Sequence, residues 1–293
     1  MANAASIVIP AHNEENRIRG LLEALCDPSI LSTCDIYIVC NGCSDNTFQV
    51  AKEYPGFVVV EISDAGKHLA LNEGDRLAGD IYPRLYCDAD TLVTASSIGA
   101  LVDLLTTEDV RAAGPSVRYG DDLSAWTVKL YVRALQTPLM AKWLDQHLTG
   151  RGLYGVSRIG RKQFNSFPPM FADDLFFDSQ FDLSEKRVAR DAIVTVWVPQ
   201  KLRTLIVSEV RVLEGNQQFR VTVHSEAEPD RPGTVGPRHS RIRIASRWIV
   251  VRTWMRDLRL RDVAPMMVYL GVIWSAKSIL VIRKLRGREI RWR

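Results

Sequence analysis

Short apolar runs alternate with longer amphipathic stretches through the first 90 residues, and this alternation constrains the fold more than any other feature. Four of the runs have strand character and occupy residues 6–10, 35–40, 57–62 and 82–87. The segments between them, including residues 47–54 and 67–77, have the length and pattern of helices. Short apolar strands separated by helices are typical of an α/β fold with a mostly parallel, Rossmann-like sheet. Ligands of such sheets bind at the carboxyl ends of the strands.

The remaining pattern is less regular, but it still predicts further elements. They are strands at residues 110–119 and 153–159, and helices at residues 96–105, 123–148 (with a break near Pro138) and 174–183. Asn13 is expected to cap a helix that has Glu14 and Glu15 in its first turn. The chain is therefore expected to carry a sheet flanked by helices.

Two acidic pairs follow the predicted elements at positions suited to chemistry. Asp88-Ala-Asp90 comes directly after the apolar run 82–87, and Asp173-Asp174 opens a helical pattern about 85 residues later. Carboxylates at a strand end suit a hard divalent cation, and a second pair can supply a general base. The alternative for each pair is an ordinary role as a helix cap. Together the pairs suggest metal-assisted group transfer from a diphosphate donor.

Charge is distributed unevenly along the 293 residues. Residues 238–293 carry 15 Lys and Arg against 3 Asp and Glu, whereas the rest of the chain carries 23 against 31. A polar stretch at residues 226–237, with three prolines and two glycines, marks the expected boundary between an acidic body and a basic tail. A basic tail indicates an anionic partner surface, either a membrane or a nucleic acid.

The tail has two helical patterns. Residues 238–261 predict a basic amphipathic helix whose apolar positions include Trp248, with Trp254 beside them as a further interfacial anchor. Residues 264–282 are almost wholly apolar and are interrupted by Lys277. This second helix can pack on the rest of the protein, lie in a membrane surface or span the membrane. We expect the surface location, and hence a cytoplasmic protein that is peripheral at the inner face of the membrane.

The cysteine pattern argues against a disulfide framework, because the count of five is odd and all lie in the first 87 residues. Cys40 and Cys43 have the spacing of half a zinc site, but no partner pair with zinc-finger spacing follows. Thiols kept reduced in a cytosol are the preferred interpretation. No signal peptide is visible at the N-terminus.

Five segments in one order resemble the family 2 glycosyltransferases of the GT-A fold, and the resemblance extends over residues 6–216. They are Ile-Val-Ile-Pro-Ala-His-Asn-Glu-Glu from Ile7, Val-Cys-Asn-Gly-Cys-Ser-Asp-Asn-Thr from Val39, Gly-Lys-His-Leu-Ala-Leu-Asn from Gly66, Asp-Ala-Asp from Asp88, and Asp-Asp-Leu from Asp173. The resemblance implies an inverting transferase that moves a sugar from a nucleoside-diphosphate sugar to an acceptor hydroxyl with Mg²⁺ or Mn²⁺.

The resemblance also implies roles for individual residues. Asp90 is expected to bind the cation, with Asp88 at the metal or the ribose. Asp174 is expected to be the general base, and Asp173, which replaces a usual Glu, to orient the acceptor. The remaining predicted donor contacts are Pro10, Ala11, Glu14, Asn41, Lys67 and Arg211. Asn41 would read the base edge, and Lys67 and Arg211 would reach the phosphates.

These expectations divide the chain into a GT-A catalytic domain at residues 1–225 and a basic helical tail at residues 226–293. Residues 1–118 would bind the nucleotide sugar and residues 119–225 the acceptor, a glycan or a lipid-linked molecule. The Gln-x-x-Arg-Trp segment of processive members is absent from the sequence, which favours a single transfer. Two alternatives remain: a sugar nucleotidyltransferase, and a non-catalytic module that binds membrane or nucleic acid. We expect a membrane partner and no nucleic acid, with the oligomeric state open.

Overall fold

The structure is a computed structural model, and it describes residues 4–226 and 259–286. The strands are β1 (Ala5–Ala11), β2 (Cys34–Asn41), β3 (Val58–Ile62), β4 (Arg84–Cys87), β5 (Thr91–Leu92), β6 (Ala112–Gly120), β7 (Leu153–Val156) and β8 (Lys186–Trp197). The helices of the first half are α1 (Ile18–Leu25), α2 (Pro28–Leu31), α3 (Thr47–Lys52), α4 (Lys67–Ala78) and α5 (Ala95–Leu105). Those of the second half are α6 (Trp126–Leu135), α7 (Pro138–Leu144), α8 (Arg158–Arg161), α9 (Asp173–Ser179), α10 (Leu202–Glu226), η1 (Leu260–Asp262) and α12 (Val263–Leu285).

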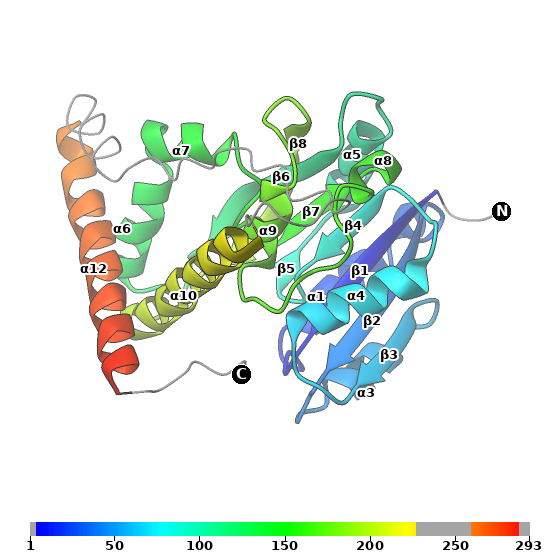
Figure 1. The fold of residues 1–293 in the computed structure, drawn as a ribbon, viewed down its shortest axis with the longest axis horizontal. Helices are drawn as coiled ribbons and strands as arrows, with labels where there is room; N and C mark the ends of the chain where they lie inside the picture. Colours follow the sequence, from blue (N-terminus) through cyan, green and yellow to red (C-terminus); the bar gives the residue numbers. More distant parts are fainter. Residues whose placement is uncertain (1–3, 227–258, 287–293) are drawn as a thin grey trace.

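In the described residues the strands form one sheet of eight, in the order β3-β2-β1-β4-β7-β6-β8-β5. The first four are parallel to one another, whereas β7 runs antiparallel to both β4 and β6. The predicted α/β class with flanking helices is confirmed, and the sheet is mixed rather than uniformly parallel (Figure 1). The antiparallel β7 marks the point at which the regular alternation of the first half ends.

Helices cover both faces of the sheet, and the central strands are therefore buried on both sides. All seven residues of β1 are buried. Ile7 and Ile9 pack into a core cluster that includes α1 and α5, whereas Val8 points to the opposite cluster with α4 and α9. On that second face α4 comes so close to β1 that a side chain at Gly74 would collide with Val8.

Several predicted elements are corrected by the structure. Asn13 does not cap a helix, because α1 begins at Ile18 and Asn13 has a left-handed backbone (φ 54°) with its Oδ1 accepting a hydrogen bond from the Ser44 N–H at 2.8 Å. The long helix expected at residues 123–148 is broken near Pro138, as expected, into the shorter helices α6 and α7, and Pro138 is in the first turn of α7. Neither the strand β8 nor the helix α10 was predicted.

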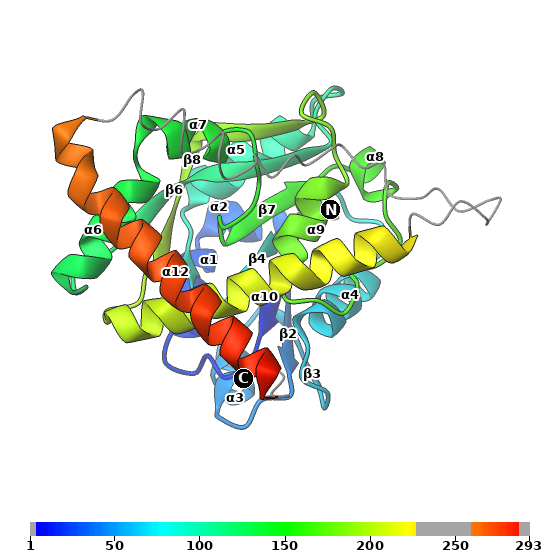
Figure 2. The same cartoon turned by 60° about the vertical axis from the view of Figure 1, so that its left-hand side comes forward.

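The last described helix, α12, packs on the helices of the second half of the chain rather than standing apart from them. It crosses α10 and lies beside α6 (Figures 1 and 2). Tyr269 stacks on Tyr131 of α6 with ring centroids 5.4 Å apart, and Val272 joins a buried cluster with Val128 and Leu205. The apolar helix predicted at residues 264–282 is present. Nearly all of the predicted amphipathic helix, with Trp248 and Trp254, lies outside the described residues.

Candidate active site

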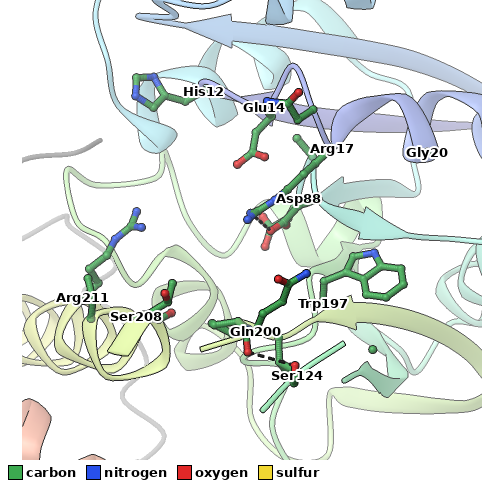
Figure 3. A pocket seen from close by; sticks show the side chains of 18 of the residues that line it. His12, Glu14, Arg17, Gly20, Asp88, Ser124, Trp197, Gln200, Ser208 and Arg211 are labelled. Carbon is green, nitrogen blue, oxygen red and sulfur yellow. Dashed lines mark hydrogen bonds and ion pairs between the residues drawn. The ribbon is translucent and has the colours of Figure 1, made fainter. Parts of the chain in front are cut away.

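A large pocket opens where the carboxyl ends of β1, β2 and β4 meet, as the parallel topology requires. Its volume is about 1060 Å³. One wall comes from the segment after β1 and from the loop after β4, and the opposite wall comes from the end of β8 and the start of α10. Figure 3 shows His12, Glu14, Arg17 and Asp88 across from Trp197, Gln200, Ser208 and Arg211. The predicted site residues that line the pocket are Pro10, Glu14, Asn41, Lys67, Asp88, Asp90 and Arg211.

The first acidic pair lies in the turn between β4 and β5. The Asp88 N–H donates a hydrogen bond to the Gly152 carbonyl oxygen at 2.8 Å, which fixes this turn to the residue before β7. Asp90 is partly exposed in the pocket, and its Oδ2 lies 3.6 Å from the guanidinium of Arg17. Neither carboxylate caps α5, because Thr94 is the cap of that helix. The two side chains are thus directed to the pocket by the turn itself.

The second acidic pair opens α9. Asp173 is buried and accepts a hydrogen bond from the Tyr154 hydroxyl at 2.8 Å. Asp174 accepts hydrogen bonds from the N–H groups of Gly150 at 2.6 Å and Leu175 at 2.7 Å. Burial, together with the charge of Asp173, raises the pKa of Asp174 above its ordinary value. Such a shift moves a carboxyl toward the range in which it can accept a proton.

Lys67 joins the two acidic pairs. It is the first residue of α4, and its Nζ lies 2.7 Å from Asp88 Oδ1 and 3.0 Å from Asp173 Oδ2. Burial disfavours the ammonium, but the two carboxylates outweigh this effect and raise the pKa of Lys67. Although Asp173 and Asp174 do not line the pocket, Lys67 therefore holds the second pair directly beside it.

Negative charge accumulates on the β1 side of the pocket. Burial and the nearby charge of Asp90 raise the pKa of Glu14 to about 7. Partial burial raises the pKa of Asp88 to about 6, with Lys67 opposing the shift and Asp173 and Asp90 adding to it. Carboxylates crowded in this way favour a divalent cation, whose charge relieves their repulsion.

The donor set suits Mg²⁺ or Mn²⁺ held by few protein ligands. In the described part of the chain no three His, Cys, Asp or Glu side chains are placed to hold a metal together. Hard divalent cations of this kind bind through one or two carboxylates, and substrate phosphates and waters complete the coordination. Asp90, which is the more exposed member of the pair, and Asp88 fit that pattern.

The residues predicted to contact the nucleotide base differ in their exposure. Asn41 is buried, with its Nδ2 donating to the Ala11 carbonyl at 2.8 Å and its Oδ1 accepting from the Gly66 N–H at 2.9 Å. Ala11 is fully buried and does not line the pocket, and its carbonyl oxygen is occupied by Asn41. Asn41 thus ties β1 to the segment that leads into Lys67. A direct contact between its side chain and a base stays a prediction.

The pocket wall formed by residues 197–208 was missed by the sequence interpretation, which named only Arg211 beyond it. Trp197 lies at the end of β8 opposite Gly120 of β6, and any side chain at Gly120 would collide with its indole ring. Ser124, Gln200 and Ser208 complete this wall (Figure 3). A signal was present in the alternation of residues 192–197, in which Ala192 and Val194 are buried. Arg17, the neighbour of Asp90, was also missed.

Comparison with known proteins decides the family. A family model described as Glycosyl transferase family 2 matches residues 6–163, which is more than half of the chain. The chain belongs to this family. It is therefore a glycosyltransferase, which decides against the nucleotidyltransferase and the non-catalytic module. A search of the curated proteins found no match to the sequence.

Solved structures of GT-A glycosyltransferases share the fold of this family 2 member. The mannosyltransferase PcManGT from Pyrobaculum calidifontis, in complex with GDP-Man and Mn²⁺, superposes with a TM-score of 0.62 at 16% identity, covering 99% of this chain and 89% of that one. TarS residues 1–349 from S. aureus, in complex with UDP, give a TM-score of 0.51 at 12% identity, covering 98% and 93%. At these identities the likeness shows the fold.

Proposed function

We propose that the protein is an inverting, metal-assisted glycosyltransferase that makes a single transfer from a nucleoside-diphosphate sugar to an acceptor hydroxyl. The observation that carries this proposal is the position of Lys67, which contacts Asp88 of the first acidic pair and Asp173 of the second. The carboxylates predicted to bind the donor and the pair predicted to include the general base therefore lie close together, because both contact the same lysine. Transfer between two bound substrates requires such proximity.

The donor half of the site is assigned to residues 1–118. Asp90, with Asp88, would hold the cation, which when bound neutralises charge on the diphosphate leaving group. Pro10 and Glu14 line the nucleotide side of the pocket, and Arg211 reaches it from α10 (Figure 3). Lys67 supplies a fixed positive charge beside the diphosphate. The complexes of PcManGT with GDP-Man and Mn²⁺ and of TarS with UDP support a donor of this chemical class.

The acceptor half is assigned to residues 119–225. Asp174 would accept the proton of the acceptor hydroxyl while that oxygen attacks the anomeric carbon from the face opposite the diphosphate, which inverts the configuration. Its two backbone hydrogen bonds hold the carboxylate in one orientation. Asp173 is buried, and its Oδ2 contacts both the Tyr154 hydroxyl and Lys67, so we assign it a positioning role rather than contact with the acceptor.

A single transfer is supported by the absence of the Gln-x-x-Arg-Trp motif that processive members carry. Here the nearest counterpart, residues 215–218, reads Gly-Asn-Gln-Gln and lies within α10. Gly215 packs against Ala172, directly before the acidic pair of α9. This part of the helix supports α9, and it offers no aromatic platform for a growing polymer.

The exposed face of α12 supports an acceptor located at a membrane. Among the described residues, Leu260–Leu285 is the one helix long and apolar enough to span a bilayer, and 22% of its most apolar window is buried. Its solvent-facing side carries exposed apolar residues on both sides of Lys277 and Ser278, and this surface is from here on called the α12 stripe. The stripe consists of Val263, Met267, Leu270, Trp274, Val281 and Leu285, each at least 39% exposed. Since the opposite face packs on α6 and α10, we infer that α12 lies in the membrane surface and does not span it.

The experiment that tests the proposed function is a transfer and hydrolysis assay with UDP-, GDP- and dTDP-sugars, with and without Mn²⁺. We expect the enzyme to turn over at least one of these donors, and only in the presence of the cation. Asp90→Ala should abolish both this turnover and metal-dependent nucleotide binding. Asp103→Ala, on the surface of α5, is the matched control. Full activity of Asp90→Ala, or full activity in EDTA, would contradict the metal assignment.

A further inference from the structure

An exposed tryptophan lies in the active-site pocket, and the proposed chemistry gives it no role. Trp197 is the last residue of β8, it lines the pocket, and it is 53% exposed (Figure 3). Tryptophan is buried over most of its surface in an average protein, because its indole is large and apolar. Binding pockets are the places where aromatic side chains stay accessible to a ligand. The indole of Trp197 is therefore a candidate contact for one of the substrates.

The backbone of β6 holds this indole in place. Trp197 pairs with Gly120, and a Cβ at Gly120 would come within 3.1 Å of the ring atoms Cδ2, Cε3 and Cζ3. The six-membered part of the indole thus packs where a side chain would otherwise lie. The chain after Trp197 is also tied down, because the Val198 N–H donates to the Gly120 carbonyl at 3.3 Å and the Ser124 hydroxyl donates to the Pro199 carbonyl at 3.2 Å. The ring is therefore positioned before any ligand binds.

The strand pairing places the indole beside the proposed cation site. Thr91, the residue after Asp90, pairs with Val196, the residue before Trp197. Since β5 and β8 are antiparallel, Asp90 and Trp197 are the next neighbours along these two strands. In the sheet, β8 lies on the opposite side of β4 from β2, which ends at Asn41. The pocket thus extends from the predicted nucleoside contacts, past the acidic pair, to Trp197.

This order of contacts assigns a substrate group to the indole, in a step that rests on the proposed function. With the nucleoside on the β2 side and the diphosphate at the cation, the group on the β8 side is the sugar bonded to the second phosphate. The faces of a pyranose ring consist of C–H bonds, which are attracted to the electron-rich face of an aromatic ring. Ser124 and Gln200 line the same wall and carry the hydroxyl and the amide that sugar hydroxyls can bind.

We propose that Trp197 binds the pyranose ring of the donor by stacking and so determines which sugar nucleotides the enzyme accepts, with Gly120 as the residue that positions the indole. The second half of the chain then contributes to donor binding through β8 as well as through Arg211 of α10. The nucleobase and a sugar of the acceptor are the other rings that could stack on an indole. The experiment distinguishes all three.

The first experiment measures affinities by isothermal titration calorimetry in the presence of Mn²⁺, with UDP, GDP and dTDP compared with UDP-glucose, GDP-mannose and dTDP-glucose. Trp197→Leu should lower the affinity for the sugar nucleotide by about two- to tenfold, the usual range for one aromatic contact, and leave the affinity for the nucleoside diphosphate unchanged. Trp197→Phe, which keeps an aromatic ring, should lose less. Trp126→Leu is the matched control, since Trp126 is 70% exposed on α6 and does not line this pocket.

The second experiment moves the indole without removing it. Gly120→Ala introduces the Cβ that collides with the ring, so this variant should lose affinity for the sugar nucleotide and keep its affinity for the nucleoside diphosphate. Gly99→Ala, in α5, is the control, because a Cβ there meets nothing within 4 Å. The thermal midpoint without ligand shows whether each variant is folded. If Gly120→Ala does not fold, the Trp197 variants still decide the proposal.

Three results would overturn the proposal. An equal loss of affinity for both ligands in Trp197→Leu would mean that the indole stacks on the base. Unchanged donor affinity with a higher KM for the acceptor would assign the indole to the acceptor. A wild type that binds a nucleoside diphosphate but none of the three sugar nucleotides would leave the indole without a pyranose to bind. By contrast, a wild type that binds no nucleotide of either kind would contradict the proposed function itself.

Discussion

At the scale of single residues, the candidate site depends on the ammonium group of Lys67, which is shared between two carboxylates. Lys67 is largely buried between Asp88 and Asp173, and both ion pairs are within hydrogen-bonding distance. Removing one partner of a buried ion pair destabilises the fold more than replacing the whole pair with apolar residues, because the remaining charge stays buried without a partner. Lys67 therefore has a structural role even without substrate, in addition to its proposed contact with the diphosphate.

Replacing Lys67 with Met should test this role. The change keeps most of the side-chain volume but leaves two carboxylates facing each other, so the free energy of unfolding should fall by about 3 to 5 kcal/mol. Urea denaturation at neutral pH measures it, with Lys162→Met on an exposed surface as the control. Equal stability of the two variants would show that Asp88 and Asp173 do not need the lysine.

Asp174→Asn is nearly isosteric but cannot accept a proton. The transfer rate should fall by about 10² to 10⁴, the usual contribution of a general base, while donor affinity stays near normal. Because the pKa of Asp174 is raised, wild-type activity should be lost as pH falls through a value above the ordinary range of Asp. Steady-state kinetics against pH measures both effects, with the exposed Asp182→Asn as control. If Asp174→Asn transfers sugar at the wild-type rate, Asp174 is not the general base and only accepts hydrogen bonds at the start of α9.

The sequence could name most of the candidate site residues, such as Asp88 and Asp174, because each follows a recognisable strand or opens a helix. It could not show that Asn41 is buried, since that depends on how closely the Ala11 and Gly66 backbones approach it. Nor could it identify Arg17, whose position beside Asp90 arises only when the segment after β1 passes over the segment after β4. Contacts between segments distant in the chain carry no local signal.

At the scale of elements, α9 holds the loop before β7 in place. Asp174 binds the Gly150 N–H, and one turn later Asp178 binds the Leu148 N–H at 2.7 Å. Asp178 is also 2.9 Å from His147 Nδ1 and 2.6 Å from Lys186 Nζ, and it is fully buried. The proposed base and the loop beside it thus share one helix as their support, so loosening α9 should disturb both.

Asp178→Asn should therefore destabilise the fold by about 3 to 5 kcal/mol at pH 7, because Lys186 would be left buried without its partner. Burial opposes ionisation of Asp178, but His147 and Lys186 outweigh it and lower its pKa. A carboxyl with a lowered pKa stabilises the fold above its unfolded pKa, about 3.9, and loses that contribution as pH falls through the folded value. The difference from wild type should hence narrow below about pH 4.

Urea denaturation over this pH range measures the effect, and Asp145→Asn is the matched control. Asp145 lies at the end of α7, close to the same loop, and pairs with the exposed Arg190 at 3.6 Å. Exposed ion pairs contribute little to the free energy of unfolding, so this variant should be about as stable as the wild type. A deficit of the same size in both variants would mean that Asp178 is not the residue that anchors the loop.

The same scale explains which elements the sequence could predict. Strands buried on both faces, such as β1 and β2, have continuous apolar runs, and their positions were predicted to within about two residues. By contrast, β8 mixes charged residues with small apolar ones because one end of it borders solvent. The polar and apolar residues of α10 contact three different surroundings, namely the pocket, α9 and α12, so no single apolar stripe marks the helix.

At the scale of the whole molecule, the catalytic fold presents its active site and an apolar surface through the same group of helices. The start of α10 lines the pocket, and the same helix packs against α12, whose α12 stripe faces solvent. Basic residues lie at both ends of that stripe, including Arg259, Arg261, Arg283, Lys284 and Arg286. An apolar stripe between basic ends is typical of a helix that lies in an anionic membrane surface.

We therefore expect the full chain to float with phosphatidylglycerol vesicles at low salt and to dissociate as salt rises. Each basic residue near such a surface adds on the order of 1 kcal/mol, which salt screens, while the α12 stripe adds an apolar contribution. Replacing Met267, Leu270 and Trp274 together with Ser should abolish flotation without exposing the core, because their side chains face solvent. Val212→Ser with Val221→Ser, on exposed positions of α10, is the matched control. If the wild type does not bind anionic vesicles at low salt, α12 only packs against α6 and α10. The inference of an acceptor located at a membrane would then be wrong.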